Sequence, residues 1–330
     1  MKMRWMIGVL LLAGFALSWA VPHFGWLDPY ILLVLMYLGI NIILTASLNL
    51  VNGYMGEFSV GHAGFMAVGA YVSSVLTVNL FPVTGAVFLF PVAVVGGGLA
   101  ASLAGLLVSI PSFRTRGDYL AIVTLAFGMI VKSALENIES VGGPRGFMGM
   151  EQLTTLPWVY VWVVVTIWIL RNLVFSKYGR GMAAIREDEV ACDLCGVHTR
   201  RVKISAFVVS AFFAGVAGGL YAHVLQFINP RMFDILKSTE ILIMVYLGGM
   251  ASLGGSILGA SIYTIAMELL REQGAWRMVL MPLLLILLML FRPRGLFGLR
   301  EFPWLVPLRD LVLLRPVKKQ KEKTHVPAGS

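Results

Sequence analysis

Long apolar segments recur along the whole chain and constrain its fold more than any other feature. Windows of roughly 17–25 mostly apolar residues follow one another, and each can cross a hydrocarbon layer of about 30 Å as a helix. Charged residues make up 13% of the 330 residues, where an ordinary globular domain has about 25%. The sequence therefore predicts an all-α fold, a polytopic transmembrane helical bundle with about ten crossings within a range of roughly eight to ten.

Basic residues sit in blocks beside the apolar segments, and this distribution orients the chain. Lys and Arg gather near both termini and in residues 171–203, whereas the loop 136–157 carries three Glu residues against one Arg. Because cytoplasmic loops are enriched in Lys and Arg, we expect both termini and the polar segment 175–203 to be cytoplasmic. The acidic loop is then outside. The net charge of +9 reflects this orientation, and no nucleic-acid partner is expected.

Two segments leave the number of crossings open. Residues 6–21 could be a cleaved signal peptide, but the many spans that follow favour an uncleaved first helix. A glycine-rich break at residues 248–255 divides the apolar run 238–270 into two pieces, each shorter than a normal crossing. Two short crossings place the basic tail, residues 299–330, inside the cell, whereas one crossing places it outside. We therefore expect a transmembrane domain over residues 1–298 and a basic, partly disordered cytoplasmic tail near anionic lipid.

Residues 49–64 interrupt the apolar pattern with four glycines, two asparagines, a glutamate and a histidine. Backbone freed from regular helix at membrane depth persists only where protein or a water-filled cavity satisfies its polar groups. The pattern G-x-x-S-x-G occurs at residues 56–61 and again at 249–254, and glycine-interrupted segments in corresponding halves indicate a transport pathway. The predicted pathway-lining residues are Asn49, Asn52, Glu57, Ser59, His62 and Ser252. The alternative is a cytoplasmic loop followed by a close contact between helices.

Motifs for nucleotide hydrolysis and covalent catalysis are missing from the sequence. The pattern G-x-x-x-x-G-K-[ST] does not occur, so the chain cannot bind ATP through a P-loop, and the nucleophile motif G-x-S-x-G is also absent. Cys192 and Cys195 form a C-x-x-C without a second cysteine pair, which favours two free thiols over a zinc site. Lys132 lies near the end of a span, where snorkelling to the interface is expected. We expect no catalytic residue, metal or cofactor, and any ATP-driven role needs a partner chain.

Four separated blocks carry a further pattern. They are GHAGFMAVGAY at 61–71, RGDYLAIVTL at 116–125, the stretch from RGMAAIREDE at 180–189 to AFFAGVAG at 211–218, and RPRGLFG at 292–298. In this order they resemble the branched-chain amino acid ABC-importer permease family, and more closely its LivM-type subunit. The resemblance covers about residues 30–298.

The resemblance implies a subunit that works within a larger assembly in the bacterial inner membrane. Its partners would be a second homologous permease subunit, two ATP-binding-cassette ATPase subunits, a periplasmic or extracellular substrate-binding protein and membrane lipid. The segment 175–203 would contact an ATPase through a short amphipathic helix whose start is shaped by glycines. The residues implied in this coupling are Gly179, Arg180, Gly181, Arg186, Glu187 and Asp188. One departure from the family pattern, Met129 followed by Lys132 where an acidic residue is expected, bears on substrate choice.

Several kinds of function stay open. The resemblance favours the permease subunit of an ATP-binding-cassette importer for branched-chain or similar small amino acids. A urea or short-amide importer of the same type is the runner-up, and the identity of the binding protein would separate the two. A stand-alone channel or ion-coupled carrier would transport without partners, although the sequence lacks a dense relay of Asp, Glu and His. A membrane enzyme is least favoured, because no catalytic constellation is present.

Overall fold

Helices make up nearly all of the regular structure in this computed structural model. The structure describes residues 2–25, 27–80, 86–113, 119–274, 276–291, 295–296, 301 and 306. Within them, the helices long and apolar enough to cross a membrane are Pro29–Met55, His62–Leu80, Phe88–Ser112, Tyr119–Asn137, Leu156–Val174 and Thr199–Leu225. Leu11–His23 and Leu253–Leu269 are shorter apolar helices. The chain is therefore a multi-pass, all-α membrane protein.

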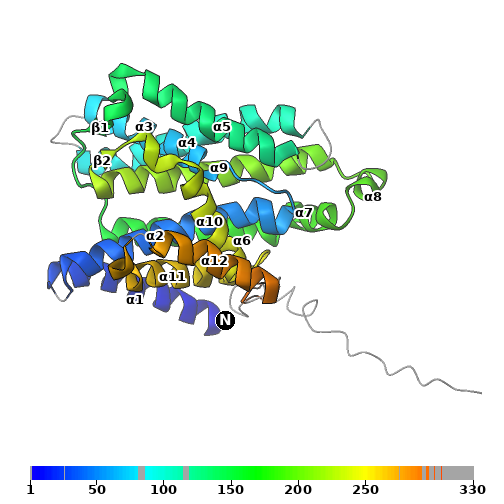
Figure 1. Ribbon diagram of the computed structural model, residues 1–330. Helices are drawn as coiled ribbons and strands as arrows, with labels where there is room; N and C mark the ends of the chain where they lie inside the picture. The colour runs from blue at the N-terminus through cyan, green and yellow to red at the C-terminus, as the bar shows by residue number, and fades with distance from the viewer. Residues whose placement is uncertain are drawn as a thin grey trace, which may run out of the picture.

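The helices form two groups that meet along α2 and α9 (Figure 1). One group contains α3 (His62–Val75), α4 (Ala86–Ser112), α5 (Tyr119–Asn137) and α9 (Thr199–Leu225), and the other contains α2 (Pro29–Asn49), α6 (Leu156–Val174), α10 (Ile235–Gly248) and α11 (Leu253–Leu269). Helix α2 packs against α6, α9, α10 and α11. Ile40, Ile43 and Leu44 are fully buried by these neighbours. A helix enclosed on several sides needs apolar residues all round, and α2 has them.

Glycines let α3, α4 and α9 pack at very short distances. A Cβ atom at Gly69 of α3 would lie 2.2 Å from the Cα atom of Gly215 in α9. One at Gly98 of α4 would lie 2.9 Å from the ring of Phe212 in α9. Lipid tails are as apolar as the side chains, so close packing of this kind is a main source of helix association in membranes. Residues 214–219 of α9 therefore pack tightly on α3 and α4.

Helix α2 unwinds in steps before α3 begins. It ends at Asn49 and continues as a π-helical segment, Leu50–Met55, which Gly56 ends in the left-handed conformation with φ 78°. Residues 57–61 have no regular structure, and α3 starts at His62. π-Helical turns are rare and often occur at functional sites. The expected break in regular helix is confirmed here.

The glycine-rich break after α10 turns the chain back on itself. Helix α10 ends at Gly248 and has 14 residues, and α11 begins at Leu253 and has 17. A Cβ atom at Gly248 would lie 2.0 Å from the carbonyl oxygen of Gly255. One at Gly259 would lie 2.2 Å from that of Met244, so the two helices are antiparallel. The apolar run 238–270 therefore forms two short helices, as predicted from the glycine-rich break at residues 248–255.

A small antiparallel ladder ties together the loops at the opposite end of the bundle from this turn. Strand β1 (Phe147–Met148) pairs with β2 (Phe227–Ile228), and Phe147 faces Ile228. The ladder connects the loop after α5 to the chain that leaves α9. The polypeptide then enters a 3₁₀ turn, Pro230–Phe233, before α10.

Three further helices complete the first two thirds of the chain. Helix α1 (Lys2–His23) packs on α6, where the hydroxyl of Tyr160 donates a hydrogen bond to the carbonyl of Leu11 at 3.1 Å. Helices α7 (Lys177–Glu187) and α8 (Glu189–Leu194) lie between α6 and α9 in the sequence and project at one end of the bundle (Figure 1).

After α12 (Trp276–Phe291) the chain returns to the turn between α10 and α11. The backbone N–H of Leu296 donates to the carbonyl of Leu247 at 3.0 Å. Apart from positions 301 and 306, the basic tail 299–330 lies outside the described residues, as does the RGD part of the block at 116–125.

Candidate functional site

Helix α7 is a short amphipathic helix whose sequence explains its burial. The Ser176 hydroxyl caps its start by accepting a hydrogen bond from the backbone N–H of Tyr178 at 3.1 Å. Gly179, Met182 and Ile185 are buried, and their spacing of three residues places them on one face. The remaining faces carry polar and charged side chains, so α7 rests on the bundle with a polar surface turned outward.

Gly179 and Gly181 have very different surroundings. A Cβ atom at Gly179 would lie 1.8 Å from the carbonyl oxygen of Val174, at the end of α6, and this position therefore requires glycine. At Gly181 the nearest atom would be a methyl group of Val202 at 3.7 Å, which is an ordinary contact. At the start of α7, Gly179 thus requires the absence of a side chain, whereas Gly181 does not. The sequence pattern implied that both glycines shape this start.

Two of the implied coupling residues hold α7 and α8 in place. Arg186 donates from Nη1 to the carbonyl of Gly53 at 3.1 Å, and a Cβ atom at Gly56 would lie 2.5 Å from its Cγ. Asp188 accepts a hydrogen bond from the backbone N–H of Ala191 at 3.0 Å and thereby caps α8. Arg186 connects α7 to the π-helical segment after α2, and Asp188 sets the start of α8.

The outward side chains of α7 and α8 form a mixed apolar and charged surface, called here the α7–α8 surface. It consists of Tyr178, Arg180, Glu187, Val190 and Leu194, all exposed. The Leu194 side chain is 85% exposed. Several exposed apolar residues beside charges on a projecting element are typical of a protein contact. The sequence pattern missed Val190 and Leu194, because a six-residue helix has too few turns to show periodicity.

The two cysteines of this region differ in environment. Cys192 is buried, Cys195 is exposed, and both are free thiols. Desolvation raises the pKa of the Cys192 thiol, and neighbouring acidic side chains raise it further. Within the described residues, no group of three or more His, Cys, Asp or Glu side chains could hold a metal ion.

Asn49 joins the end of α2 to the turn between α10 and α11. Its Nδ2 donates to the carbonyl of Ser252 at 2.9 Å and to the hydroxyl of Ser256 at 2.7 Å. Its Oδ1 accepts from the backbone N–H of Ala251 at 3.0 Å. A fully buried amide that is satisfied on both sides fastens these elements together. Asn49 and Ser252, both predicted to line a pathway, thus meet at one junction.

The polar groups in and around the irregular segment, residues 57–61, are hydrogen-bonded within the protein. These bonds involve Asn52, Ser59 and His62. The amide of Asn52 donates to the carbonyl of Ser59 at 3.3 Å and accepts from its N–H at 3.2 Å. The buried His62 lies with Nε2 2.8 Å from the hydroxyl of Ser47 in α2. Glu57 points toward α9 and forms an ion pair there. These polar groups meet the demand for internal hydrogen bonding at membrane depth.

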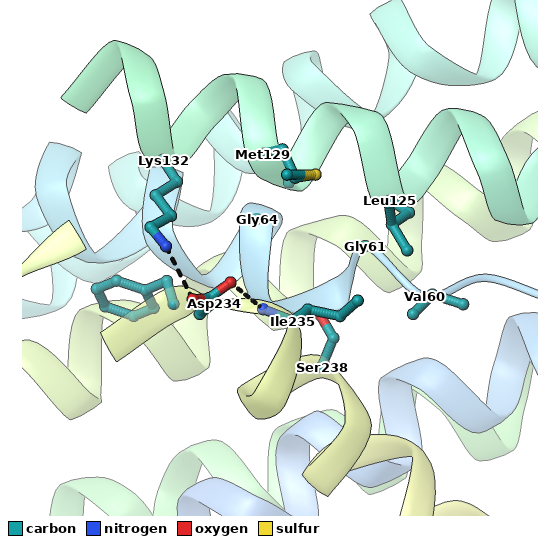
Figure 2. Close-up of a pocket in the computed structure, with 11 residues that line it drawn as sticks. Val60, Gly61, Gly64, Leu125, Met129, Lys132, Asp234, Ile235 and Ser238 are labelled. Carbon is teal, nitrogen blue, oxygen red and sulfur yellow. Dashed lines mark hydrogen bonds and ion pairs between the residues drawn. The ribbon is translucent and has the colours of Figure 1, made fainter. Parts of the chain in front are cut away.

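A small cavity lies beside the irregular segment, where the starts of α3 and α10 meet α5 (Figure 2). Its lining consists of Val60, Gly61, Gly64, Leu125, Gly128, Met129, Lys132, Phe233, Asp234, Ile235 and Ser238. The volume of about 20 Å³ is room for one water molecule, not for an amino acid. The six predicted lining residues do not belong to this set, although Val60, Gly61 and Gly64, which are close to them in the sequence, do.

Lys132 of α5 and Asp234 before α10 form an ion pair at the cavity (Figure 2). The Lys132 Nζ lies 2.8 Å from Oδ2 of Asp234, and the other carboxylate oxygen accepts from the N–H of Ile235 at 2.6 Å. Lys132 therefore has an acidic partner within the chain, while 25% of its side chain and 38% of that of Asp234 stay exposed. A paired charge is much less costly than an isolated one in a membrane. Snorkelling of Lys132 to the interface stays a prediction.

Membrane helices that break beside a small cavity, with a short amphipathic helix exposed at one end, are typical of a transport permease. Residues 30–291 match the family described as branched-chain amino acid transport system / permease component. That match covers most of the chain, and the chain belongs to this family. It is a permease subunit of an ABC importer.

Individual relatives agree with this membership. The high-affinity branched-chain amino acid transport system permease protein LivM of Escherichia coli (strain K12) is 36% identical over 292 residues, 78% of this chain and 67% of that protein. The probable branched-chain amino acid transport permease protein LivM of Methanocaldococcus jannaschii is 25% identical, and the match covers 83% of this chain and 94% of that protein. The probable branched-chain amino acid transport permease protein LivH of the same organism is also 25% identical, and the match covers 72% of this chain and 77% of that protein. No solved structure matches the chain.

Proposed function

We propose that this chain is one of two permease subunits of a bacterial inner-membrane importer for branched-chain amino acids. The observation that carries the proposal is its 36% identity to a LivM permease over most of its length. A relative named LivH is also similar to the chain, which supports a second, homologous permease as its partner. Two ATPase subunits and an external binding protein complete the assembly, and the chain itself hydrolyses no ATP.

We propose ten crossings, made by α1 to α6 and α9 to α12, with both termini in the cytoplasm. Three observations support this. The Arg186 side chain reaches Gly53, beside the turn between α10 and α11, so α7 and that turn share one end of the bundle. The far end of α11 meets the start of α2, where the Tyr30 hydroxyl donates to Glu268. The chain after α12 returns to Leu247. Helices α11 and α12 then each connect opposite ends.

The α7–α8 surface serves as the contact with an ATPase subunit in this proposal. Arg180 and Glu187 offer charges, and Leu194 offers an apolar side chain that no neighbour in the described residues covers. Gly179, Gly181, Arg186 and Asp188 shape and anchor the two helices beneath that contact. Because α7 is joined to the π-helical segment, a force on α7 reaches the end of α2.

The cavity beside α5 and α10 marks the transport pathway in a closed state. Its walls are largely apolar, with Leu125, Met129 and Ile235 among them, and suit an aliphatic side chain. The Lys132–Asp234 pair can separate without leaving either charge uncompensated if a zwitterion supplies a carboxylate and an ammonium group. Urea and short amides carry no such charges. This difference favours amino acids over the runner-up substrates.

Reconstitution tests the proposed function directly. The chain is co-expressed with its neighbouring permease, ATPase and binding-protein genes and reconstituted into liposomes, and uptake of leucine and of urea is measured with and without ATP. We expect leucine uptake that requires ATP, the binding protein and both permeases. Leucine uptake by this chain alone would favour a stand-alone carrier, and ATP-driven uptake of urea in its place would favour the runner-up.

A further inference from the structure

Lys203 lies near the start of α9 and is almost completely buried between two carboxylates. Its Nζ is 2.5 Å from Oε1 of Glu57 and 2.8 Å from Oε1 of Glu189, and 7% of the side chain is exposed. The ring of Phe113, after α4, lies on a further side with its centre 5.8 Å from Nζ. Compensation of this kind is required, because an unpaired charge in a low-dielectric environment is strongly destabilising.

The two carboxylates come from separate elements of the fold. Glu189 is the first residue of α8 and lies beside the α7–α8 surface. Glu57 belongs to the irregular segment between α2 and α3. Lys203 therefore connects α8 to that segment through one buried group. The hydrogen bond from Arg186 to the carbonyl of Gly53 forms a second connection, between α7 and the preceding π-helical segment.

The irregular segment leads from Glu57 directly to the cavity wall. The backbone N–H of Val60 donates to the hydroxyl of Thr124 in α5 at 3.1 Å. A Cβ atom at Gly61 would lie 2.1 Å from the carbonyl oxygen of Thr124, so the chain touches α5 closely where it lines the cavity. Residues 57–61 thus have one end at Lys203 and the other at the cavity. A displacement of Glu57 reaches the wall within a few residues.

We propose that Lys203 is a positioning residue for coupled transport. It holds α8 and residues 57–61 together, so that movement of the α7–α8 surface on an ATPase also moves the cavity wall. The inference rests on the proposed function, because it needs an ATPase at that surface. It assigns Glu57 to this connection and not to the lining of the pathway. Coupling then follows because both sites bias one conformational equilibrium.

The test compares variants of the complete reconstituted importer by two readouts, leucine uptake and the stimulation of ATP hydrolysis by loaded binding protein. Lys203→Met removes the charge and Glu189→Gln weakens only the α8 side, while Lys203→Arg keeps the charge. The matched control is Arg201→Met, which makes the same charge change at an exposed position two residues away.

We expect Lys203→Met and Glu189→Gln to lower uptake per ATP hydrolysed by at least about fivefold, which is the low end of the range that ordinary coupling produces. Lys203→Arg should recover part of the loss, and Arg201→Met should behave as wild type.

A double-variant comparison separates this role from simple anchoring. Glu57→Gln and Glu189→Gln interrupt the same connection, so their combination should lower uptake per ATP no more than either alone. Glu189→Gln leaves Lys203 with one carboxylate, which keeps the test valid if Lys203→Met fails to fold. Reduced thermal stability with unchanged uptake per ATP in assembled complexes would overturn the inference. A wild-type complex without binding-protein-stimulated hydrolysis would instead overturn the proposed function.

Discussion

Individual contacts determine which residues of α7 tolerate substitution. Gly179 touches the backbone of α6, whereas a Cβ atom at Gly181 would only reach ordinary contact distance from the methyl groups of Val202. The sequence presents the two glycines as equivalent members of one motif. Their difference arises from the direction in which each Cα faces, and that direction depends on how α7 folds back on α6.

Substitutions at the two glycines should therefore have opposite effects. Gly179→Ala places a methyl group against a carbonyl oxygen and should destabilise the protein by about 1–3 kcal/mol, as overpacking does. Gly181→Ala removes a flexible residue from a helix and should be neutral or stabilising by up to about 1 kcal/mol. Thermal unfolding of the purified protein in detergent measures both. Equal melting temperatures for the two variants would contradict the assignment.

The two cysteines should react with alkylating reagents at different rates. Thiolate is the reactive form, and the pKa of the Cys192 thiol lies above its ordinary value of 9.0. Alkylation of Cys192 in a Cys195→Ser variant should be slow near neutral pH and should still increase above pH 9. Exposed Cys195 in a Cys192→Ser variant should react much faster at neutral pH. Mass spectrometry after timed maleimide treatment gives both rates, and equal rates would show that α8 does not bury Cys192.

At the scale of elements, short segments connect the ends of helices to one another. Helix α8 has only six residues and depends on the Asp188 cap and on Lys203 for its position. Helix α10 begins at Ile235, and the carboxylate of the preceding residue, Asp234, both caps the helix and pairs with α5. Each element is therefore defined by contacts with partners far away in the sequence.

An apolar contact on α8 should contribute to ATPase binding. Leu194→Asp places a charge where the proposed contact is apolar and should weaken association with the ATPase at least about tenfold, as loss of a central contact residue does. Leu194→Met keeps an apolar side chain and serves as the control. Titration of the purified ATPase onto the permease pair measures the affinity. Wild-type affinity in the Asp variant would remove Leu194 from the contact.

Removing the Lys132–Asp234 pair should separate stability from transport. Lys132→Met leaves a carboxylate unpaired and should lower the melting temperature, whereas the double variant Lys132→Met, Asp234→Asn removes both charges and should recover much of that loss. If the charges also receive the zwitterionic substrate, leucine uptake by the double variant stays low. Melting temperatures and ATP-driven uptake measure the two effects. Normal uptake by the double variant would restrict the pair to a structural role.

At the scale of the whole molecule, the structural features described above gather at opposite ends of the helical bundle (Figure 1). The α7–α8 surface and the turn between α10 and α11 lie at one end. The β1–β2 ladder and the contact between Tyr30 and Glu268 lie at the other. The cavity lies between them, beside the break in regular helix that precedes α3.

Labelling from the two sides of the membrane tests this arrangement. In a background without native cysteines, Ser140→Cys at the β1 end should react with an impermeant maleimide in intact cells. A chain with Cys195 as its single cysteine should react only after permeabilisation, because α8 is then cytoplasmic. Both positions are exposed, so burial does not limit the reaction. Labelling of both from outside would contradict the ten-crossing topology.

The sequence by itself determined the class of this protein, its family and the positions where its helices break. Hydropathy over about twenty residues and local glycine content are properties of neighbouring positions, and they decide which segments enter a membrane. Tertiary structure alone decided what those breaks contact. Lys132 meets Asp234, Lys203 meets Glu57, and Asn49 meets Ser252 across large sequence separations. These pairs depend on how helices pack and rotate against one another, because apolar helices in lipid present no local pattern that specifies a partner.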